Sequence, residues 1–305
     1  MKVSIKQMEM RHIRYFLAVA SERNFTRAAA KLGIGQPPLS MQIKDLETEI
    51  GYALFNRTAQ GVELTEAGRA FLQSVQPLPG IASAAVDAAR RAAQGESGSL
   101  RLGFTGTVGM NPLVPGFIRA FRQAYPDVML NVMEANSIVL LQALANQQLD
   151  IALLRQENAI PDNVTVQLLL QEPLVAALPL NHPQARLRGK IALPSLRDEH
   201  FILTPKESGT SLRESVLQAC RQQGFTPVEG QPAPHIVSIL SVVAAGLGVS
   251  LVPESMRQFS LSGVVFKQIK APVPTTGLAV AWHEHALTAT AHNFLGLVRG
   301  SGVIV

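Results

Sequence analysis

The first candidates for chemistry in this 305-residue chain are polar residues on one face of a short amphipathic segment, residues 35–51. Its apolar residues follow one another at steps of four, three and four, so a helix would bury all of them together. They are Leu39, Ile43, Leu46 and Ile50. The opposite face would be free to hydrogen-bond or pack against a ligand such as the base edges of a DNA major groove. It carries Pro37, Met41, Lys44 and Thr48, with Ser40 and Asp45 at its edges.

The flanking residues predict where this helix begins and ends. Gly35 stands at the N-cap position and Gly51 at the C-terminal stop. Pro37 and Pro38 fall in the first turn, where a missing N–H costs no helical hydrogen bond. A helix is therefore expected to fill the segment between the two glycines.

Two further helices are expected before this segment, over residues 12–22 and 26–32. Thr26 is the expected cap of the second helix, and Gly33 makes the tight turn that follows it. The buried stripe of that second helix would be Phe25, Ala28, Ala29 and Leu32.

Two short strands are expected after the third helix, over residues 54–57 and 62–64, and they form a wing around Gly61. Three short helices with a wing make a winged helix-turn-helix, in which the second helix of the helix-turn-helix enters a DNA groove. The alternative is an ordinary helical subdomain with no role in binding nucleic acid. The order of elements, the Gln-Pro-Pro start of the third helix and the basic Arg57 in the wing favour DNA.

Motifs between Met10 and about Leu72 then make a family resemblance specific. They are FLAVA at 16–20, FTRAA at 25–29, QPPLS at 36–40, LETEIG at 46–51, LFNR at 54–57 and LTEAG at 64–68. With them the chain resembles LysR-type transcriptional regulators, and in pattern the regulators of aromatic catabolism in particular. The resemblance implies that Gln36, Pro37, Pro38 and Ser40 contact DNA and that Arg57 binds a phosphate. The whole DNA-binding set that we expect is Thr26, Arg27, Gln36, Pro37, Pro38, Ser40, Met41, Lys44 and Arg57.

Two positions depart from the pattern of that family. Gly35 stands where a hydroxyl residue is usual, which costs a few tenths of a kcal/mol in capping. Met41 stands where many relatives carry Arg. A thioether cannot bond guanine through two hydrogen bonds, but it can pack on a thymine methyl, so we expect a preference for A·T pairs at that contact.

A long linker helix is expected over residues 66–93, capped by Thr65. Its apolar residues recur at alternating steps of four and three, which is typical of a two-stranded coiled coil that would pair two chains. They are Phe71, Val75, Leu78, Ala82, Ala85, Ala89 and Ala92. An amphipathic helix packed on its own domain is the alternative. Pro77 and Pro79 predict a kink or break within 76–80, and residues 94–98 read as a hinge.

From Leu100 onward, strand and helix patterns alternate, which predicts parallel sheets with right-handed crossovers. The fold class is thus α plus α/β: a winged helix-turn-helix, a linker helix and a two-lobed domain that resembles the periplasmic-binding-protein-like effector domain of the same family. We expect the DNA-binding domain at 1–65, the linker at 66–95 and the effector-binding domain at 96–305. Lobe one would comprise 96–170 and 275–305, and lobe two 171–274.

Hydroxyl and amide residues follow the expected strands, where parallel sheets bind ligands and helix N-termini point. By resemblance, Thr107 and Ser137 match residues that hold an effector carboxylate, and Ser137 would also cap the helix 138–147. Arg155 would add a charge-assisted bond. Residues 211–214 would form a capping box on the facing lobe. The expected effector-binding set is Thr105, Thr107, Asn136, Ser137, Arg155, Pro205, Ser208 and Thr210, and the alternative for each is an ordinary cap or turn residue.

Other chemical candidates are weaker. Cys220, the one cysteine, is expected to be a small core residue, and its isolation is consistent with a reducing cytoplasm. His283, His285 and His292 could bind a metal, but a polar loop is the stronger reading. No nucleophile–base pair is supported, so we expect no catalysis, no cofactor and no metal.

The composition fits an anionic partner. The chain has a net charge of +5, and residues 1–95 carry twelve Lys and Arg against eight Asp and Glu. No apolar run reaches 18 residues and no signal peptide is apparent, so we expect a cytoplasmic protein with no membrane partner.

The expected function is a transcriptional regulator that responds to a small, carboxylate-bearing effector, either an aromatic or a dicarboxylic acid. The expected partners are double-stranded DNA, that organic acid, RNA polymerase and further copies of the chain in a dimer of dimers. A cytoplasmic solute-binding protein with an N-terminal oligomerisation module is the alternative, and an enzyme acting in the cleft is a second one.

Overall fold

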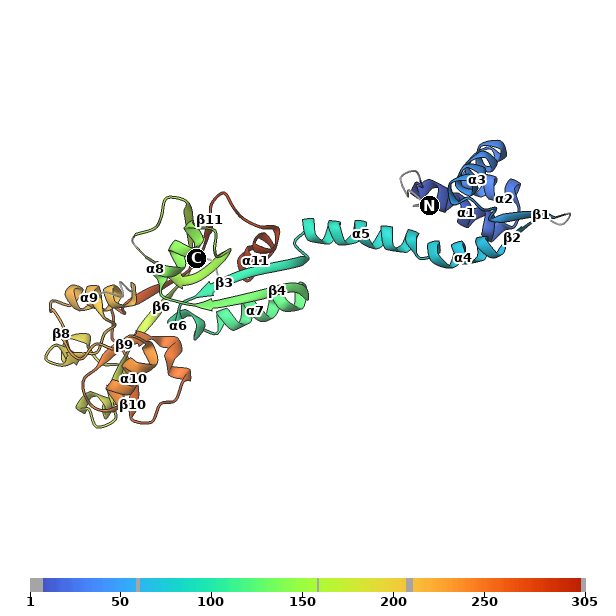
Figure 1. Ribbon diagram of the computed structural model, residues 1–305. Coiled ribbons are helices and arrows are strands. Elements are labelled where there is room, and N and C mark those ends of the chain that lie inside the picture. The colour runs from blue at the N-terminus through green and yellow to red at the C-terminus, as the bar shows by residue number, and fades with distance from the viewer. Residues whose placement is uncertain (1–7, 59–60, 158, 207–210, 303–305) are drawn as a thin grey trace. The chain divides into compact units, whose positions relative to one another are not determined.

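The computed structural model describes residues 8–58, 61–157, 159–206 and 211–302 (Figure 1). The chain divides into two compact units, Met1–Ala89 and Arg90–Val305. Among the described residues, no helix has both the length and the apolar character needed to cross a membrane.

The first unit begins with three helices and a two-stranded hairpin. The helices are α1 (Met10–Glu22), α2 (Phe25–Leu32) and α3 (Gln36–Ile50), and the antiparallel strands are β1 (Phe55–Thr58) and β2 (Gly61–Leu64). Phe16 lies at the centre of the core, with its ring 5.1 Å from that of Phe55 and 4.8 Å from that of Phe71. Aromatic contacts therefore join the helices to the hairpin and to the helix that follows it.

The helix caps confirm most of the expected boundaries and correct one. Gly35 and Gly51 flank α3 as expected, and Gly51 adopts φ 83°, which a glycine reaches without steric cost. Thr26 was expected to cap α2, and this is wrong. Asn24 is the cap, because its side chain accepts a hydrogen bond from the Arg27 N–H at 3.0 Å and α2 begins one residue earlier.

The linker is broken where the prolines predict. Helix α4 (Glu66–Val75) ends before Pro77, and α5 (Leu78–Ala93) begins after it. The expected coiled-coil seam divides at the same place. Val75 is buried in the core of the first unit, against which Phe71 and Leu78 also pack, whereas α5 has no buried residue among those described. The alternative of a helix packed on its own domain thus holds for α4, and α5 keeps an exposed apolar face.

The expected hinge at 94–98 is wrong. Gly95 is buried, and a Cβ built on it would lie 2.5 Å from the Ala289 carbonyl carbon. The Asn293 amide donates to the carbonyls of Gln94 and Gly95 at 2.8 and 3.2 Å. The segment is therefore fixed to helix α11 (Ala289–Gly300), a long-range contact that a local Gly-rich pattern does not show.

The second unit is built on a seven-stranded sheet of order β10-β6-β11-β5-β3-β4, with β9 also paired to β6. Strands β3 (Ser97–Phe104), β4 (Asp127–Glu134) and β5 (Ile151–Arg155) are parallel, as expected. The remaining strands of this sheet are antiparallel, so the expectation of parallel pairing is wrong for them. They are β6 (Val164–Pro179), β9 (Ser250–Pro253), β10 (Val264–Gln268) and β11 (Thr275–His283).

Strand β6 joins two lobes because its first half pairs with β11 and its second half with β9 and β10. Lobe one contains β3, β4, β5, β11 and the helices α6 (Gly106–Gly109), α7 (Leu113–Ala124), α8 (Ser137–Ala145) and α11. Lobe two contains β9, β10, the parallel pair β7 (His200–Phe201) and β8 (Val228–Glu229), and the helices α9 (Ser211–Gln222) and α10 (Ile236–Ala244). Short 3-10 turns among the described residues include Pro183–Ala185, Leu193–Leu196 and Glu254–Gln258.

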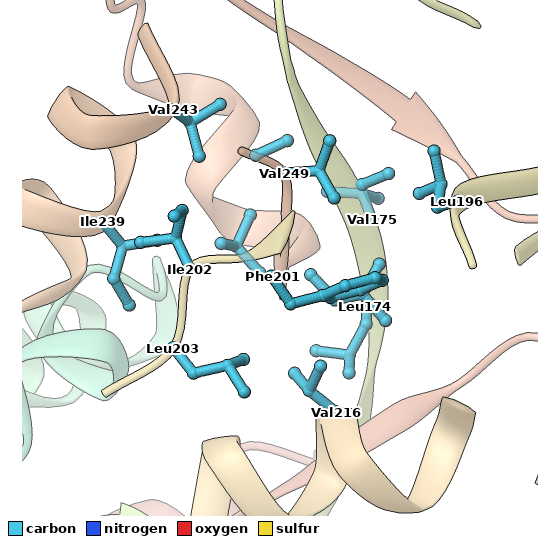
Figure 2. Close-up of a cluster of buried hydrophobic side chains, with 14 of the residues drawn as sticks. Leu174, Val175, Leu196, Phe201, Ile202, Leu203, Val216, Ile239, Val243 and Val249 are labelled. Carbon is cyan, nitrogen blue, oxygen red and sulfur yellow. The ribbon is translucent and has the colours of Figure 1, made fainter. Parts of the chain in front are cut away.

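Alternating apolar residues explain how the central strands are covered on both faces. Ile151 and Leu153 of β5 pack in the core with α7 and α11, whereas Ala152 and Leu154 pack with α8. In lobe two, Phe201 and Ile202 pack with Leu174 and Val175 of β6 and with residues of α9 and α10 (Figure 2). Both lobes therefore have packed apolar cores, and the strand ends between them can hold a site.

Candidate nucleic-acid interface and ligand cleft

Helix α3 presents the face that the sequence predicts. Leu39, Ile43 and Leu46 are buried, whereas Met41 is 58% exposed. The Gln36 side-chain amide donates to the Ser40 hydroxyl at 3.0 Å, so the two polar residues of the first turn support one another. Gln36, Pro37, Pro38 and Lys44 are exposed, and Ser40 is half-buried.

Basic and polar residues flank this helix on the neighbouring elements. Arg57 is exposed on β1, and its guanidinium lies 5.7 Å from the centre of the Phe25 ring. Thr26 and Arg27 are exposed at the start of α2. The Arg27 guanidinium donates to the Glu22 carbonyl at 2.6 Å, which fixes its direction.

Glu47 is a positioning residue that the sequence did not reveal. It lies in the C-terminal half of α3, and its Oε1 accepts hydrogen bonds from the N–H groups of Leu54 and Phe55 at 2.7 and 3.1 Å. It thereby anchors the first strand of the wing to α3. The negative charges of Glu47, Asp45 and Glu49 also repel phosphates from the C-terminal end of α3.

A cavity of about 360 Å³ lies between the two lobes of the second unit. This volume is in the range of sites for small organic ligands. Its lining combines residues that were expected with others that were not: Thr105, Gly106, Thr107, Met110, Glu134, Ala135, Asn136, Ser137, Arg155, Thr204, Ser211, Leu212, Pro234, His235, Ile236 and Val237.

The hydroxyl and amide residues of lobe one come together at one wall of this cavity. Thr105 is buried, and its hydroxyl lies 3.5 Å from that of Thr107. Ser137 was expected to cap α8, and this is wrong, because Asn136 accepts from the Val139 N–H at 2.9 Å. Ser137 is instead the first residue of the helix and is buried in the cavity wall.

Arg155 also lines the cavity, but its charge is already paired. Its side chain is 2% exposed and lies 2.8 Å from the carboxylate of Glu172, which is 5% exposed. The guanidinium also donates to the Thr107 carbonyl at 3.2 Å. Burial acts to raise the pKa of Glu172, but the Arg155 charge and the Ser255 hydrogen bonds outweigh it, so that pKa lies below its usual range.

Glu157 is a second carboxylate that the sequence did not single out. It follows β5, and its Oε1 accepts the Ser211 N–H at 3.2 Å across the cleft. This contact replaces the expected capping box at residues 211–214, because the donor at the start of α9 is bound by a distant residue instead of Glu214. Burial raises the pKa of Glu157, and a hydrogen bond from Ser137 opposes that rise.

Among the expected residues of lobe two, Pro205 does not line this cavity. Pro205 lines a separate cavity of about 190 Å³ beside Arg213 and Lys206. Ser208 and Thr210 lie outside the described residues. Within the described residues, the facing wall is supplied by the starts of α9 and α10 and by the end of the segment after β7. The residues are Thr204, Ser211, Leu212, Pro234, His235, Ile236 and Val237.

The other chemical candidates have ordinary structural roles. Cys220 is fully buried, which raises its pKa to about 12 and keeps the thiol protonated. His283 lies 3.3 Å from the Asn163 amide, and its Nδ1 accepts the His285 N–H at 3.1 Å. These contacts confirm the core position of the cysteine and the polar turn at the histidines.

Comparison with known families agrees with this arrangement. Residues 10–69 match the model described as "Bacterial regulatory helix-turn-helix protein, lysR family", and residues 93–302 match "LysR substrate binding domain". The regulator BudR of Raoultella terrigena is 37% identical over 288 residues, which is 94% of this chain and 99% of BudR. The Hca operon transcriptional activator HcaR of Escherichia coli (strain K12) is 35% identical over 292 residues, which is 96% of this chain and 97% of HcaR.

Solved structures show the same fold. The crystal structure of CbnR, a LysR family transcriptional regulator, is 25% identical, with a TM-score of 0.84 over 96% of this chain and 100% of CbnR. The structure of full-length CbnR complexed with its target DNA has a TM-score of 0.83 at 25% identity, over 96% of this chain and 99% of that one.

Proposed function

This chain belongs to the LysR family of DNA-binding transcriptional regulators, and from that membership we propose how it reads DNA and what class of effector it binds. Regulators of this family bind small-molecule effectors, and the chain is a regulator of this class and not an enzyme. The observation that carries the proposal is the exposed first half of α3, which offers hydrogen-bonding groups on a rigid helix.

For DNA, the proposed reading surface is the start of α3 together with the wing. Gln36, Ser40 and Met41 would face base edges, and Arg57 would bind phosphate. Pro37, Pro38, Lys44, Thr26 and Arg27 complete the proposed contact set. Residues 1–65 would serve as the DNA-binding domain, 66–95 as the linker and 96–305 as the effector domain.

For the effector, we propose a small organic acid, aromatic or dicarboxylic, in the cleft between the lobes. Hydroxyls at Thr107 and Ser137 and the N-terminal ends of α8 and α9 favour a carboxylate there. Arg155 would act by holding Thr107 in place, since its own charge is paired with Glu172. Thr105 and Asn136 complete the wall.

We propose a dimer of dimers in the cytoplasm, paired through the exposed apolar face of α5, where Ile81 is 60% and Val86 58% exposed. A relative, HcaR, is named a transcriptional activator, which supports RNA polymerase as a further partner.

Binding of the upstream region of its own gene, measured by fluorescence anisotropy from 50 to 300 mM salt, tests the DNA proposal. We expect log affinity to fall linearly with log salt, by about 0.9 for each phosphate contacted. Arg57→Ala should reduce the steepness of that slope by about 0.9, the effect of losing one phosphate contact, whereas Arg122→Ala, which removes an exposed charge on α7 of the second unit, should not. Binding that is undetectable at 50 mM salt would instead favour the solute-binding alternative.

A further inference from the structure

Glu157 is bonded to a backbone donor in the wall of the cleft. It belongs to lobe one, two residues after the end of β5, and its carboxylate bonds the N–H of Ser211 at the start of α9 in lobe two. The side chain of Ser137, the first residue of α8, also lies close enough to lower the pKa of this carboxyl. One carboxylate of the chain itself thus joins two helix N-termini that belong to different lobes, and both of these residues line the cavity.

No cation neutralises this carboxylate within the described part of the chain. Arg155 is the one Lys or Arg among the described lining residues, and it is paired with Glu172 at 2.8 Å. Glu214 of α9 adds a like charge that disfavours ionisation of Glu157, and Glu134 lies at the same wall, with its Oε1 close above Gly106. An anion that entered the cleft beside an ionised Glu157 would therefore meet repulsion and few free donors.

We propose that Glu157 is an internal stand-in for the effector carboxylate. In the effector-free protein it holds lobe two to lobe one through the Ser211 N–H, and the Ser137 hydroxyl of lobe one lies beside its carboxylate. A carboxylate effector binds by taking its place on these two donors, and Glu157 turns toward solvent. The inference rests on the proposed acid-binding function of the cleft and assigns Glu157 as the residue that sets the affinity for acids.

Displacement has a consequence that an open anion site would not have. The effector must replace a charge-assisted hydrogen bond that already exists, so its affinity is lower than the donors alone would give. Removing the charge of Glu157 should tighten acid binding about tenfold, the effect of losing one competing charge-assisted bond. Neutral amides of the same shape, which do not compete for the site as anions, should show no such gain.

The test uses the full-length protein and isothermal titration with acetate, benzoate and succinate, each paired with its neutral amide. Glu157→Gln keeps the shape and an acceptor oxygen but removes the charge. We expect it to bind at least one of the acids about tenfold more tightly than the wild type does, with the amides unchanged. Asp198→Asn is the matched control, because it removes an exposed carboxylate of lobe two that does not line the cavity, and its acid affinities should stay within about twofold of the wild type.

Glu157→Ala gives an independent readout, because it leaves a gap beside the Ser211 N–H that an added carboxylate can fill. We expect the start of α9 to exchange its amide hydrogens faster in this variant and acetate to restore protection, whereas acetate should not change the wild type. Equal acid affinities in the wild type and Glu157→Gln, with acid binding measured in both, would overturn the role of Glu157 alone. If no acid binds either protein or protects Glu157→Ala, the proposed effector class fails and this inference fails with it.

Discussion

The buried pair Arg155–Glu172 gives the sharpest stability prediction. The two side chains are 2% and 5% exposed and 2.8 Å apart, and Glu172 also accepts the Ser255 N–H at 2.8 Å. Glu172→Gln keeps the size and an acceptor for Ser255, but it leaves the Arg155 charge buried without a counter-ion. Loss of one member of a buried pair costs about 3–5 kcal/mol.

For a domain of this size, that loss lowers the melting temperature by about 2–4 °C per kcal/mol, or about 6–20 °C in all. The chain's single tryptophan, Trp282, lies in β11 of the second unit, so its fluorescence follows the unfolding of that unit. Arg155→Met should give a similar loss. The double variant Arg155→Met/Glu172→Leu should lose less than either single variant, because no charge remains buried.

The pH dependence follows from the lowered pKa of Glu172. A lowered pKa in the folded state contributes stability that is present above the unfolded value, about 4.3, and is lost as pH falls through the folded value. The difference between the wild type and Glu172→Gln should therefore be constant from pH 8 to 5 and shrink below that range. A loss under about 1 kcal/mol at pH 7, or a double variant less stable than both single variants, would refute this reasoning.

Three further predictions concern single side chains. Burial raises the pKa of Glu157, and a raised pKa in the folded state contributes stability that is present below the unfolded pKa and is lost as pH rises through the folded pKa. The melting temperature of Glu157→Gln minus that of the wild type should therefore be larger at pH 8 than at pH 5. An equal difference at both pH values contradicts this prediction. Met41→Ala should weaken binding to operators with A·T at the contacted pair by about 1 kcal/mol and leave G·C variants unchanged, as measured on operator variants. Glu47→Ala removes the acceptor for the Leu54 and Phe55 N–H groups and should destabilise the first unit by about 1–3 kcal/mol in thermal unfolding, whereas Glu49→Ala should have little effect.

Local sequence signals predicted most of the fold. The spacing of Leu39, Ile43 and Leu46 predicted the buried face of α3, and its flanking glycines predicted both ends. Pro77 predicted the break between α4 and α5, because a proline acts on its own turn of helix. In each case the deciding interaction lies within about four residues of the signal.

The two misplaced caps, at Thr26 and Ser137, differ from the observed caps by only one or two residues, but the larger errors depend on residues distant in the chain. The local sequence around Gly95 predicted a hinge, but the side chain of Asn293, 198 residues away, donates a hydrogen bond to the Gly95 carbonyl. The wing requires Glu47, whose carboxylate has no local signature that separates it from its neighbour Glu49. Antiparallel pairing of β11 with β6 depends on which strands meet, and helix and strand periodicity contains no information about that.

The cleft shows why this difference matters for the site itself. The rule that ligands bind where parallel strands end predicted its position and its hydroxyl wall, because that rule follows from topology. Its charge could not be predicted in the same way, since Arg155 is neutralised by Glu172 from another strand and Ser211 is bound by a carboxylate 54 residues before it. Donors that look free in the sequence are thus already occupied by groups of the chain. An effector for this cleft must therefore be argued from the contacts it would replace as well as from the donors it would meet.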